Sequence, residues 1–385
     1  MLLIGGCAGL RGGAQPVSAM SAAPPAAPPA ASVSPTPAPE PTLEERAAAI
    51  VARMGTAERA GQVLMTAGTV EELPGLEALV ERYGLGGVMV RGRTSAGVKG
   101  VAKAVRPLRD LAPDGLPLLV ATDQEGGTVQ VLRGPGFGEL PSAVEQGTWP
   151  AERLYEEARG WGAAIADAGV NLDLAPVADT PCRGYERANP PVADLRRHYA
   201  TEPERAGQRV AAVVEAFGEE GVQTTVKHFP GLGCVHANTD TTAHVVDRAI
   251  GADSARLAPF TDGIDAGAGF VMMSSATYTK LDPENPAVFS ERIIEGLLRD
   301  DLGFQGVVIT DDIGGAAAMK PWSRGDRAVT FLRAGGDLVL DIVPGDVPVL
   351  VDAIVAEADA DAAFGERLEQ AATRVVAARL ALAER

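Results

Sequence analysis

Two consecutive carboxylates, Asp311 and Asp312, close an apolar run at residues 303–312, which read GFQGVVITDD. Side chains alternate between the two faces of a β-strand, so only one of the two can point inward where such a strand ends. A carboxylate delivered in this way is suited to nucleophilic or acid/base chemistry. The segment therefore predicts a reactive carboxylate at the end of a buried strand.

A second group is the segment KHFPGLG at residues 227–233, followed by the polar loop CVHANTDTT at residues 234–242. Lys227 and His228 place a cation next to an imidazole donor, a pair suited to binding vicinal sugar hydroxyls. The proline and the two glycines then turn the chain sharply away. A hydrogen bond within the core is the alternative role for His228.

Eight short β-rich runs, separated by segments of helical periodicity, must position these groups. Eight near-continuous apolar strands that alternate with helices predict an α/β fold, a (β/α)8 TIM barrel with a single catalytic domain. The alternative is a doubly wound open sheet, but no G-x-G-x-x-G follows the first strand, so a dinucleotide site has no support. The expected strands are residues 62–66, 87–90, 118–122, 170–176, 222–228, 270–274, 307–311 and 337–341.

Polar side chains follow five of these strands at the point where each strand ends. In barrels, the carboxyl ends of the strands form the rim on which active sites are assembled. Any single aspartate after a strand could instead cap a helix, but five such ends favour a site. The residues are Asp123 after the third strand, Asp173 and Asp179 at and after the fourth, Lys227 and His228, Ser274 and Ser275, and Asp311 and Asp312.

The composition excludes several classes of function. With 385 residues, 46% of them hydrophobic, the chain can bury a large core. The 34 basic and 51 acidic residues give a formal net charge of −17, which argues against nucleic acid or an anionic membrane surface as a partner. Three cysteines, Cys7, Cys182 and Cys234, exclude a disulfide framework and allow at most one bridge.

The N-terminal segment indicates export. Cys7 follows MLLIGG, which resembles the lipobox of bacterial lipoproteins, where the chain is cleaved before a cysteine that is then lipidated. Residues 15–41 are dominated by Ala, Pro and Ser and predict a disordered tether. Residues 42–45, TLEE, form an expected capping box that opens a helix reaching Met54. The alternative is that the short apolar start has no role.

We therefore divide the chain into a lipoprotein signal remnant with its lipobox (residues 1–14), a tether (15–41) and the (β/α)8 barrel (42–385). The expected location is extracytoplasmic, on a bacterial cell membrane. The lipid at Cys7 is the only expected contact with that membrane, since no later stretch is long and apolar enough to span it.

In their order, these motifs resemble glycoside hydrolase family 3, in particular its single-domain β-N-acetylglucosaminidases. The resemblance implies that Asp311 is the nucleophile of a covalent glycosyl-enzyme intermediate and that Asp312 is structural. It also implies that Asp123 accepts hydrogen bonds from sugar hydroxyls, while Arg197, Lys227 and His228 donate them. A salt bridge is the alternative for Arg197. The motifs are residues 123–127 (DQEGG), 171–179 (NLDLAPVAD), 189–190 (NP), 197–199 (RHY), 227–231 (KHFPG) and 298–312.

The chain departs from this pattern in the loop after KHFPG. There the family carries a second histidine and a D-S-H tripeptide that supplies the acid/base, whereas this chain has Leu232, Asn238 and Asp240 at the matching positions. Asp240 is expected to act as the acid if burial or the charge of Asp311 keeps its proton in place. An Asx turn in the Thr-rich loop is the alternative.

Two further histidines and one arginine are alternatives for the missing groups. His236 and His244 lie in the same loop region and could supply an imidazole. In the family's D-Q-E-G-G-R-V-x-R stretch, the two arginines correspond to Thr128 and Val131 here, and Arg133 is the candidate to replace the lost sugar contact.

The sequence therefore predicts a monomeric retaining glycosidase, a β-N-acetylhexosaminidase that removes terminal β-linked N-acetylglucosamine from peptidoglycan fragments without a metal or a cofactor. Two alternatives remain. The missing histidine favours a non-catalytic sugar-binding lipoprotein, and the lost arginine leaves room for a β-glucosidase. The carboxylate Asp311 favours either enzyme.

Overall fold

The computed structural model describes residues 12–19, 22–23, 41–113 and 115–384. The predicted lipidation site, Cys7, and most of the predicted tether lie outside the described residues. The chain divides into two units, Met1–Glu40 and Pro41–Arg385, and the fold given below is that of the second unit.

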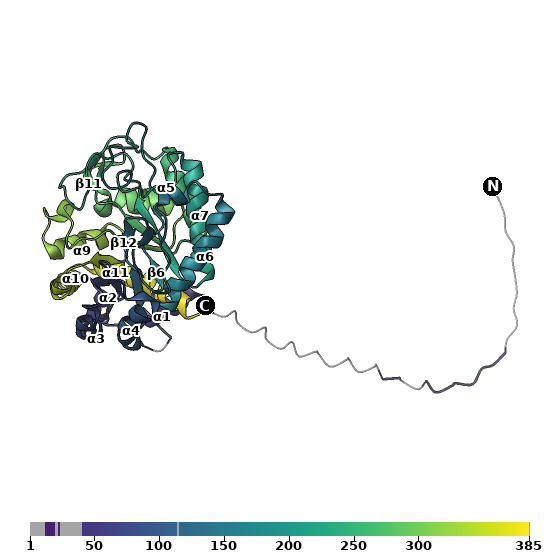
Figure 1. Cartoon of the computed structure of the whole chain (residues 1–385). Helices are drawn as coiled ribbons and strands as arrows, with labels where there is room; N and C mark the ends of the chain where they lie inside the picture. Colours follow the sequence, from purple (N-terminus) through teal and green to yellow (C-terminus); the bar gives the residue numbers. More distant parts are fainter. Residues whose placement is uncertain (1–11, 20–21, 24–40, 114, 385) are drawn as a thin grey trace, which may run out of the picture. The chain divides into compact units, whose positions relative to one another are not determined.

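Eight parallel strands form the wall of a barrel, in the order β12-β9-β7-β6-β3-β2-β1-β13. A parallel bridge between Ile309 and Leu338 closes the ring between its first and last members. The predicted (β/α)8 fold is thus confirmed, and the open-sheet alternative is wrong (Figure 1). The strands are β1 (Leu64–Gly68), β2 (Gly87–Val90), β3 (Leu119–Thr122), β6 (Leu172–Asp173), β7 (Gln223–Phe229), β9 (Phe270–Met273), β12 (Val307–Thr310) and β13 (Val339–Asp341).

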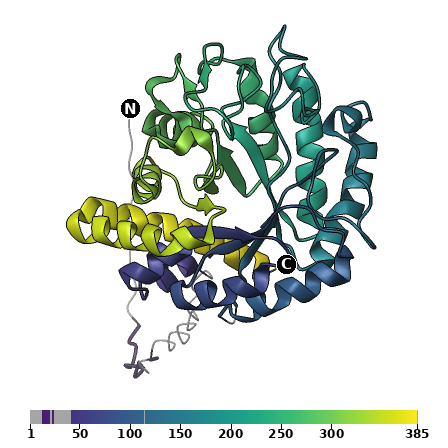
Figure 2. The ribbon, with the colours of Figure 1, turned by 60° about the vertical axis from the view of Figure 1, so that its left-hand side comes forward.

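Helices surround this ring of strands (Figure 2). The α-helices are α1 (Leu43–Val51), α2 (Thr56–Gln62), α3 (Glu77–Tyr83), α4 (Gly97–Asp110), α5 (Ala143–Gln146), α6 (Ala151–Asp167), α7 (Pro203–Glu219), α8 (Ala258–Asp265), α9 (Arg324–Arg333), α10 (Val347–Ala360) and α11 (Ala362–Ala383). Residues Arg292–Asp301 form a π-helix, η4. Short 3-10 helices are η1 (Leu73–Leu76), η2 (Ala255–Leu257), η3 (Ala287–Phe289), η5 (Ala317–Met319) and η6 (Pro344–Asp346). Shorter strands outside the wall are β4 (Gln124–Gly126), β5 (Val129–Gln130), β8 (Val246–Asp247), β10 (Thr277–Tyr278) and β11 (Asp282–Pro286).

Of the eight expected strands, the one at residues 87–90 has the expected bounds, and the others differ by one to three residues at one or both ends. The first, expected at residues 62–66, begins two residues later because Gln62 still belongs to α2, where its side chain donates to the Gly84 carbonyl. The fourth, expected at residues 170–176, pairs only over Leu172–Asp173. The run beyond Asp173 keeps hydrogen bonds to the neighbouring strand β7 without regular pairing, because the Ala175 and Pro176 carbonyls accept from the Thr225 and Lys227 amides at 2.9 and 3.3 Å.

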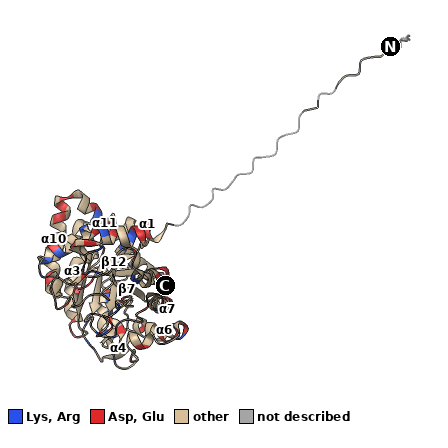
Figure 3. Ribbon diagram, turned by 90° about the horizontal axis from the view of Figure 1, so that it is seen from above, with Lys and Arg blue, Asp and Glu red and all other residues tan. Residues whose placement is uncertain are grey.

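The predicted capping box is present at the start of α1. The Thr42 hydroxyl accepts from the Glu45 amide at 3.1 Å, and the Glu45 carboxylate accepts from the Thr42 amide at 2.8 Å. The helix ends at Val51 instead of reaching Met54. Among the described residues, no helix combines the length and the apolar character needed to cross a bilayer. In Figure 3, the ribbons of α1 and α11 carry both basic (blue) and acidic (red) residues.

The barrel interior is filled with side chains and is closed by α11 at the N-terminal ends of the strands. Met65, Met89, Phe270 and Leu340 belong to a buried interior cluster that also includes Val375 of α11. Such a filled interior leaves the C-terminal ends of the strands as the place for a site.

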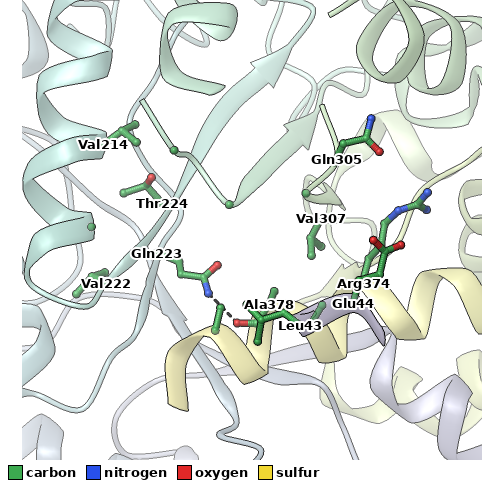
Figure 4. A pocket seen from close by; sticks show the side chains of 16 residues that line it. Leu43, Glu44, Val214, Val222, Gln223, Thr224, Gln305, Val307, Arg374 and Ala378 are labelled. Atoms are coloured by element: carbon green, nitrogen blue, oxygen red, sulfur yellow. Dashed lines mark hydrogen bonds between the residues drawn. The ribbon is translucent and has the colours of Figure 1, made fainter. Parts of the chain in front are cut away.

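A cavity of about 390 Å³ lies beside α11 at the closed end (Figure 4). Val307, at the start of β12, lines it, as does Gln223, at the start of β7, whose side-chain amide donates to the Ala378 carbonyl at 2.7 Å. None of the residues that the sequence singles out for catalysis or sugar binding lines this cavity.

Candidate active site

A second cavity, of about 420 Å³, lies at the C-terminal ends of the strands. Its floor is made of side chains from the barrel interior, among them Met89, Leu174, Met272 and Leu340. All the residues predicted for catalysis or sugar binding line this one cavity: Asp311, Asp240, Asp123, Arg197, Lys227 and His228. The barrel therefore gathers groups that lie up to 188 positions apart in the sequence.

Asp311 follows β12 directly, and the two consecutive carboxylates have different surroundings. Burial raises the pKa of Asp311 to about 6, the charge of His228 opposes this rise, and the charge of Asp240 adds to it. The carboxylate of Asp312 instead accepts from the amides of Gly314 at 2.8 Å, Gly315 at 2.9 Å and Ile342 at 3.1 Å. Asp312 thus ties the chain after β12 to the chain after β13, but both Asp311 and Asp312 line the cavity, so the expectation that only one of them points inward is wrong.

The raised pKa of Asp311 predicts an acid limb in the pH profile. Only the ionised carboxylate can attack, so kcat/KM is expected to fall about tenfold per pH unit below about pH 6 and to level off above it. Steady-state rates with an activated substrate between pH 4 and 8 measure this limb. Because the charge of Asp240 contributes to the rise, Asp240→Asn is expected to move the limb to lower pH. A limb that stays in place in this variant contradicts the proximity of the two carboxylates.

Lys227 and Arg197 both line the cavity, and both form ion pairs with the same buried carboxylate, Glu125. Lys227 Nζ lies 2.6 Å from Asp123 Oδ1 and 2.7 Å from Glu125 Oε1. Arg197 donates to both Glu125 oxygens, at 2.7 and 2.8 Å. Burial would raise the pKa of Glu125, but the charges and hydrogen bonds of Arg197 and Lys227 lower it to about 2. The salt bridge considered for Arg197 therefore exists, and it fixes a guanidinium that also lines the cavity.

Glu125 had no role assigned from the sequence, although it lies in the DQEGG motif. Another buried carboxyl, Asp173, lies behind this network. Burial raises the pKa of Asp173 to about 8, so the group holds its proton at neutral pH. Its Oδ1 accepts from the Gln124 amide at 3.0 Å. Asp173 does not line the cavity, and we assign it a role in holding the residue after Asp123.

His228 is oriented by Asp179. Its Nδ1 lies 2.8 Å from Asp179 Oδ2, and its backbone amide donates to Asp179 Oδ1 at 3.3 Å. The amide of Leu232 donates to the same oxygen at 2.7 Å. The core hydrogen bond considered for His228 is therefore present, and it leaves Nε2 toward Arg197, whose Nη2 lies 3.4 Å away. Asp179, noted in the sequence only as a strand-end residue, holds both the imidazole and the start of the next loop.

The serines after the sixth strand have no place in the cavity. Ser274 is buried, and its hydroxyl accepts from Tyr278 Oη at 2.9 Å and from the Ala276 amide at 3.1 Å. Neither Ser274 nor Ser275 lines the cavity. The expectation that all five polar strand ends contribute to one site is therefore wrong for this strand, because its serines shape the turn into β10.

Asp240 lines the cavity from an exposed loop. Its amide donates to Asn238 Oδ1 at 2.8 Å, so the loop contains an Asx turn, but its accepting side chain is Asn238 and not Asp240, the residue for which the sequence alternative considered it. The carbonyls of Thr239 and Asp240 accept from the amides of Ala318 and Ala317, each at 3.0 Å. These bonds dock the loop tip on η5, leaving the Asp240 carboxylate at the cavity. The burial considered for Asp240 from the sequence is absent, because Asp240 is exposed.

The two histidines considered as substitutes lie outside the cavity. His236 stacks on Tyr185 with ring centroids 4.3 Å apart, and its Nε2 lies 2.6 Å from Tyr185 Oη. His244 is exposed at a positive φ of 58°. Neither lines the cavity, so the structure does not support either as the source of the missing imidazole.

Arg133 does not replace the lost arginine either. Its Nε donates to the Gln130 carbonyl at 3.2 Å and its Nη2 to the Gly127 carbonyl at 3.1 Å, so its guanidinium holds the β4–β5 turn. A different arginine, Arg91, lines the cavity from the end of β2. Sequence reasoning missed it. The available signal was its position directly after an expected strand, as for Asp123.

A disulfide between Cys182 and Cys234 holds the base of the loop that carries Asp240. The Cys182 amide also donates to the Gly233 carbonyl at 2.9 Å. The Asn189 side chain donates to the carbonyls of Leu232 and Val235 at 2.7 and 2.9 Å. The segment after β6 and the segment after β7 are thus joined side by side. The sequence allowed at most one disulfide, and this is that disulfide.

Removal of this disulfide is expected to destabilise the barrel. The bridge spans 52 positions, and the double variant Cys182→Ser/Cys234→Ser should lose about 2–4 kcal/mol of unfolding free energy. Denaturant unfolding of the purified protein, with and without a thiol reductant, measures the loss. Cys7→Ser is the matched control and should unfold like the wild type. An identical transition in the double variant contradicts a stabilising role for the bridge.

Comparisons with known proteins agree with this arrangement. The model of the glycosyl hydrolase family 3 N-terminal domain matches residues 56–378. A β-hexosaminidase of Xanthomonas campestris pv. campestris is 35% identical over 266 residues, which cover 66% of this chain and 76% of that protein.

Two solved structures are also similar. The β-N-acetylhexosaminidase of Beutenbergia cavernae superposes with a TM-score of 0.82 at 43% identity, over 85% of this chain and 99% of that one. A family 3 β-N-acetylglucosaminidase of Paenibacillus sp. gives 0.78 at 29% identity, over 86% of this chain and 63% of that one.

Proposed function

Because the chain belongs to glycosyl hydrolase family 3, we propose that it is a retaining β-N-acetylhexosaminidase that removes terminal β-linked N-acetylglucosamine. The observation that carries this proposal is the convergence of Asp311 with a sugar-binding network in one cavity. The cavity ends on the packed barrel interior, so a sugar chain can enter only by its end. This favours removal of a terminal residue over cleavage within a chain.

The proposed reaction has two steps. Asp311 attacks the anomeric carbon and forms a glycosyl ester, while Asp240 gives its proton to the departing glycosidic oxygen. Asp240 then takes a proton from a water molecule, which attacks the anomeric carbon of the ester and releases the sugar and the Asp311 carboxylate.

The sugar hydroxyls are bound on the other side of the cavity. β3, which leads to Asp123, lies four strands from β12 in either direction around the ring. Asp123 and Asp311 therefore face each other across the barrel, and the pyranose lies between them. Asp123 accepts from hydroxyl groups there, and Lys227, Arg197 and His228 donate to hydroxyl and acetamido oxygens.

The test uses nitrophenyl β-N-acetylglucosaminide and the corresponding β-glucoside. Nitrophenol is a good leaving group and needs little protonation, so Asp311 alone should release a burst and leave a labelled peptide that contains it. Faster turnover of the amino sugar supports the hexosaminidase, and faster turnover of the glucoside supports the β-glucosidase alternative. If neither substrate is turned over nor labels the protein, the hydrolase proposal fails, and binding of N-acetylglucosamine tests the non-catalytic alternative.

We also propose that the natural substrates are peptidoglycan fragments and that the protein is a monomeric lipoprotein on the outer side of a bacterial membrane. The lipobox-like start before Cys7 and the Cys182–Cys234 disulfide support this location, because disulfides persist in oxidising compartments. Fractionation of cells that produce the wild type or Cys7→Ser tests the anchor. Equal membrane fractions for the two proteins contradict lipidation at Cys7.

A further inference from the structure

We infer that Arg91 determines specificity by binding the end of the terminal sugar that is remote from the scissile bond. The inference rests on the proposed function. Arg91 follows β2 directly, as Asp123 follows β3, and the register pairs Val90 with Thr122. The two residues therefore stand next to each other on neighbouring parallel strands, and both side chains line the catalytic cavity.

Arg91 has more free hydrogen-bond donors than the other cations of the cavity. Lys227 is held by two carboxylates, and Arg197 by both oxygens of Glu125 and by the Pro191 carbonyl at 2.8 Å. Within the described part of the chain, Arg91 makes one side-chain hydrogen bond, from Nη2 to Glu72 at 3.1 Å, and its buried Nε has no partner. A guanidinium has five N–H donors, so most of them remain for a ligand.

Glu72 holds this guanidinium at the cavity wall. Its carboxylate accepts from the Thr69 amide at 2.9 Å as well as from Arg91. The hydrogen bond from Thr69 lowers the pKa of Glu72, and the charge of Arg91 lowers it further, so the carboxylate stays ionised. Glu72 is thus a positioning residue that limits the motion of Arg91 without entering the cavity.

The ring order decides which part of the sugar Arg91 meets. β2 lies three strands from β12, so Arg91 and Asp123 together face Asp311 across the barrel. With the anomeric carbon at Asp311, C4 of the pyranose and the C6 hydroxyl attached beside it point toward this pair. Asp123 accepts a hydroxyl hydrogen, and Arg91 donates to the hydroxyl oxygens. The site therefore takes a neutral terminal sugar with free hydroxyls at C4 and C6.

The test combines Arg91→Gln with the 4-deoxy and 6-deoxy analogues of nitrophenyl β-N-acetylglucosaminide. On the parent substrate, the variant is expected to lose about 10–100-fold in kcat/KM, mostly through KM, because a buried ligand hydroxyl loses a charged donor. The kcat/KM of the wild type should be lower by a similar factor on one of the two deoxy analogues than on the parent substrate. On that analogue, Arg91→Gln should lose little more, because the contact is already absent.

If Arg91→Gln loses the same factor in kcat/KM on the parent substrate and on both deoxy analogues, Arg91 supports only the folded structure, and the inference is overturned. A variant with unchanged KM on the parent would overturn it as well. Arg93→Gln is the matched control, because Arg93 donates to the Thr128 carbonyl at 3.1 Å and does not line the cavity. Glu72→Gln retains Arg91 and should raise KM by a smaller factor. Absence of turnover in the wild type would instead reject the proposed function.

Discussion

Asp311→Asn is expected to lower kcat on nitrophenyl β-N-acetylglucosaminide by about 10⁴-fold or more, the largest effect of any single change in this protein. The amide cannot form the glycosyl ester, and the good leaving group does not relieve this defect. Sugar binding should survive, because Asp123, Lys227, Arg197 and His228 keep their contacts. Single-turnover rates measure the loss of glycosyl ester formation, and intact-mass analysis measures the loss of the covalent label.

Asp312→Asn is the matched control for that experiment. Asp312 accepts hydrogen bonds from three backbone amides. Its replacement is therefore expected to lower the free energy of unfolding by about 1–3 kcal/mol and to change kcat much less than Asp311→Asn does. The pair of variants therefore separates a reacting carboxylate from a structural one at adjacent positions. A loss of kcat in Asp312→Asn as large as that in Asp311→Asn, with normal stability, would reverse the assignment.

Asp240→Ala is expected to show the second largest effect, and one that depends on the leaving group. A disaccharide with a sugar leaving group needs a proton on the departing oxygen, so kcat/KM should fall about 10²–10⁴-fold. Nitrophenol departs without that proton, so the first step should stay nearly unchanged and produce a burst before slow hydrolysis of the ester. Azide, which needs no general base, should accelerate this second step.

Asn238→Ala is an intermediate case, because it removes the side-chain acceptor of the Asp240 amide but keeps the carboxylate. It should show a weaker leaving-group dependence in the same direction. Unchanged hydrolysis of the disaccharide by Asp240→Ala would remove Asp240 from the mechanism and leave the acid unassigned, with the Asp311 assignment intact.

The fold could be predicted from the sequence because the barrel is encoded locally. Each apolar run has the length of a strand, and the strands of a closed parallel sheet are buried on both faces, so composition alone marks them. Asp123 and Asp311 could be found in the same way, since a polar residue directly after a buried strand must lie at the rim. Lys227 could be found as a polar residue among the last residues of an expected strand, and it lies near the end of β7. Strand ends could not be predicted as well, as Gln62 illustrates, because this residue still belongs to α2 and its side chain bonds to the Gly84 carbonyl.

Only the tertiary structure decided which partners these groups have. Glu125 joins Arg197 across 72 positions, Asp179 orients His228 across 49, and Cys182 bridges to Cys234 across 52. No local period links such pairs, since their distance depends on where the ring brings separate loops.

The same reason explains the sequence expectations that failed. His236 and Arg133 have suitable side chains at suitable places in the sequence, but Tyr185 and the β4–β5 turn bind them away from the cavity. Arg91, which no motif marked, reaches it from the neighbouring strand. The sequence by itself determined the barrel and the residues at its rim. The packing of one loop on another decided which side chains stay free to meet a sugar.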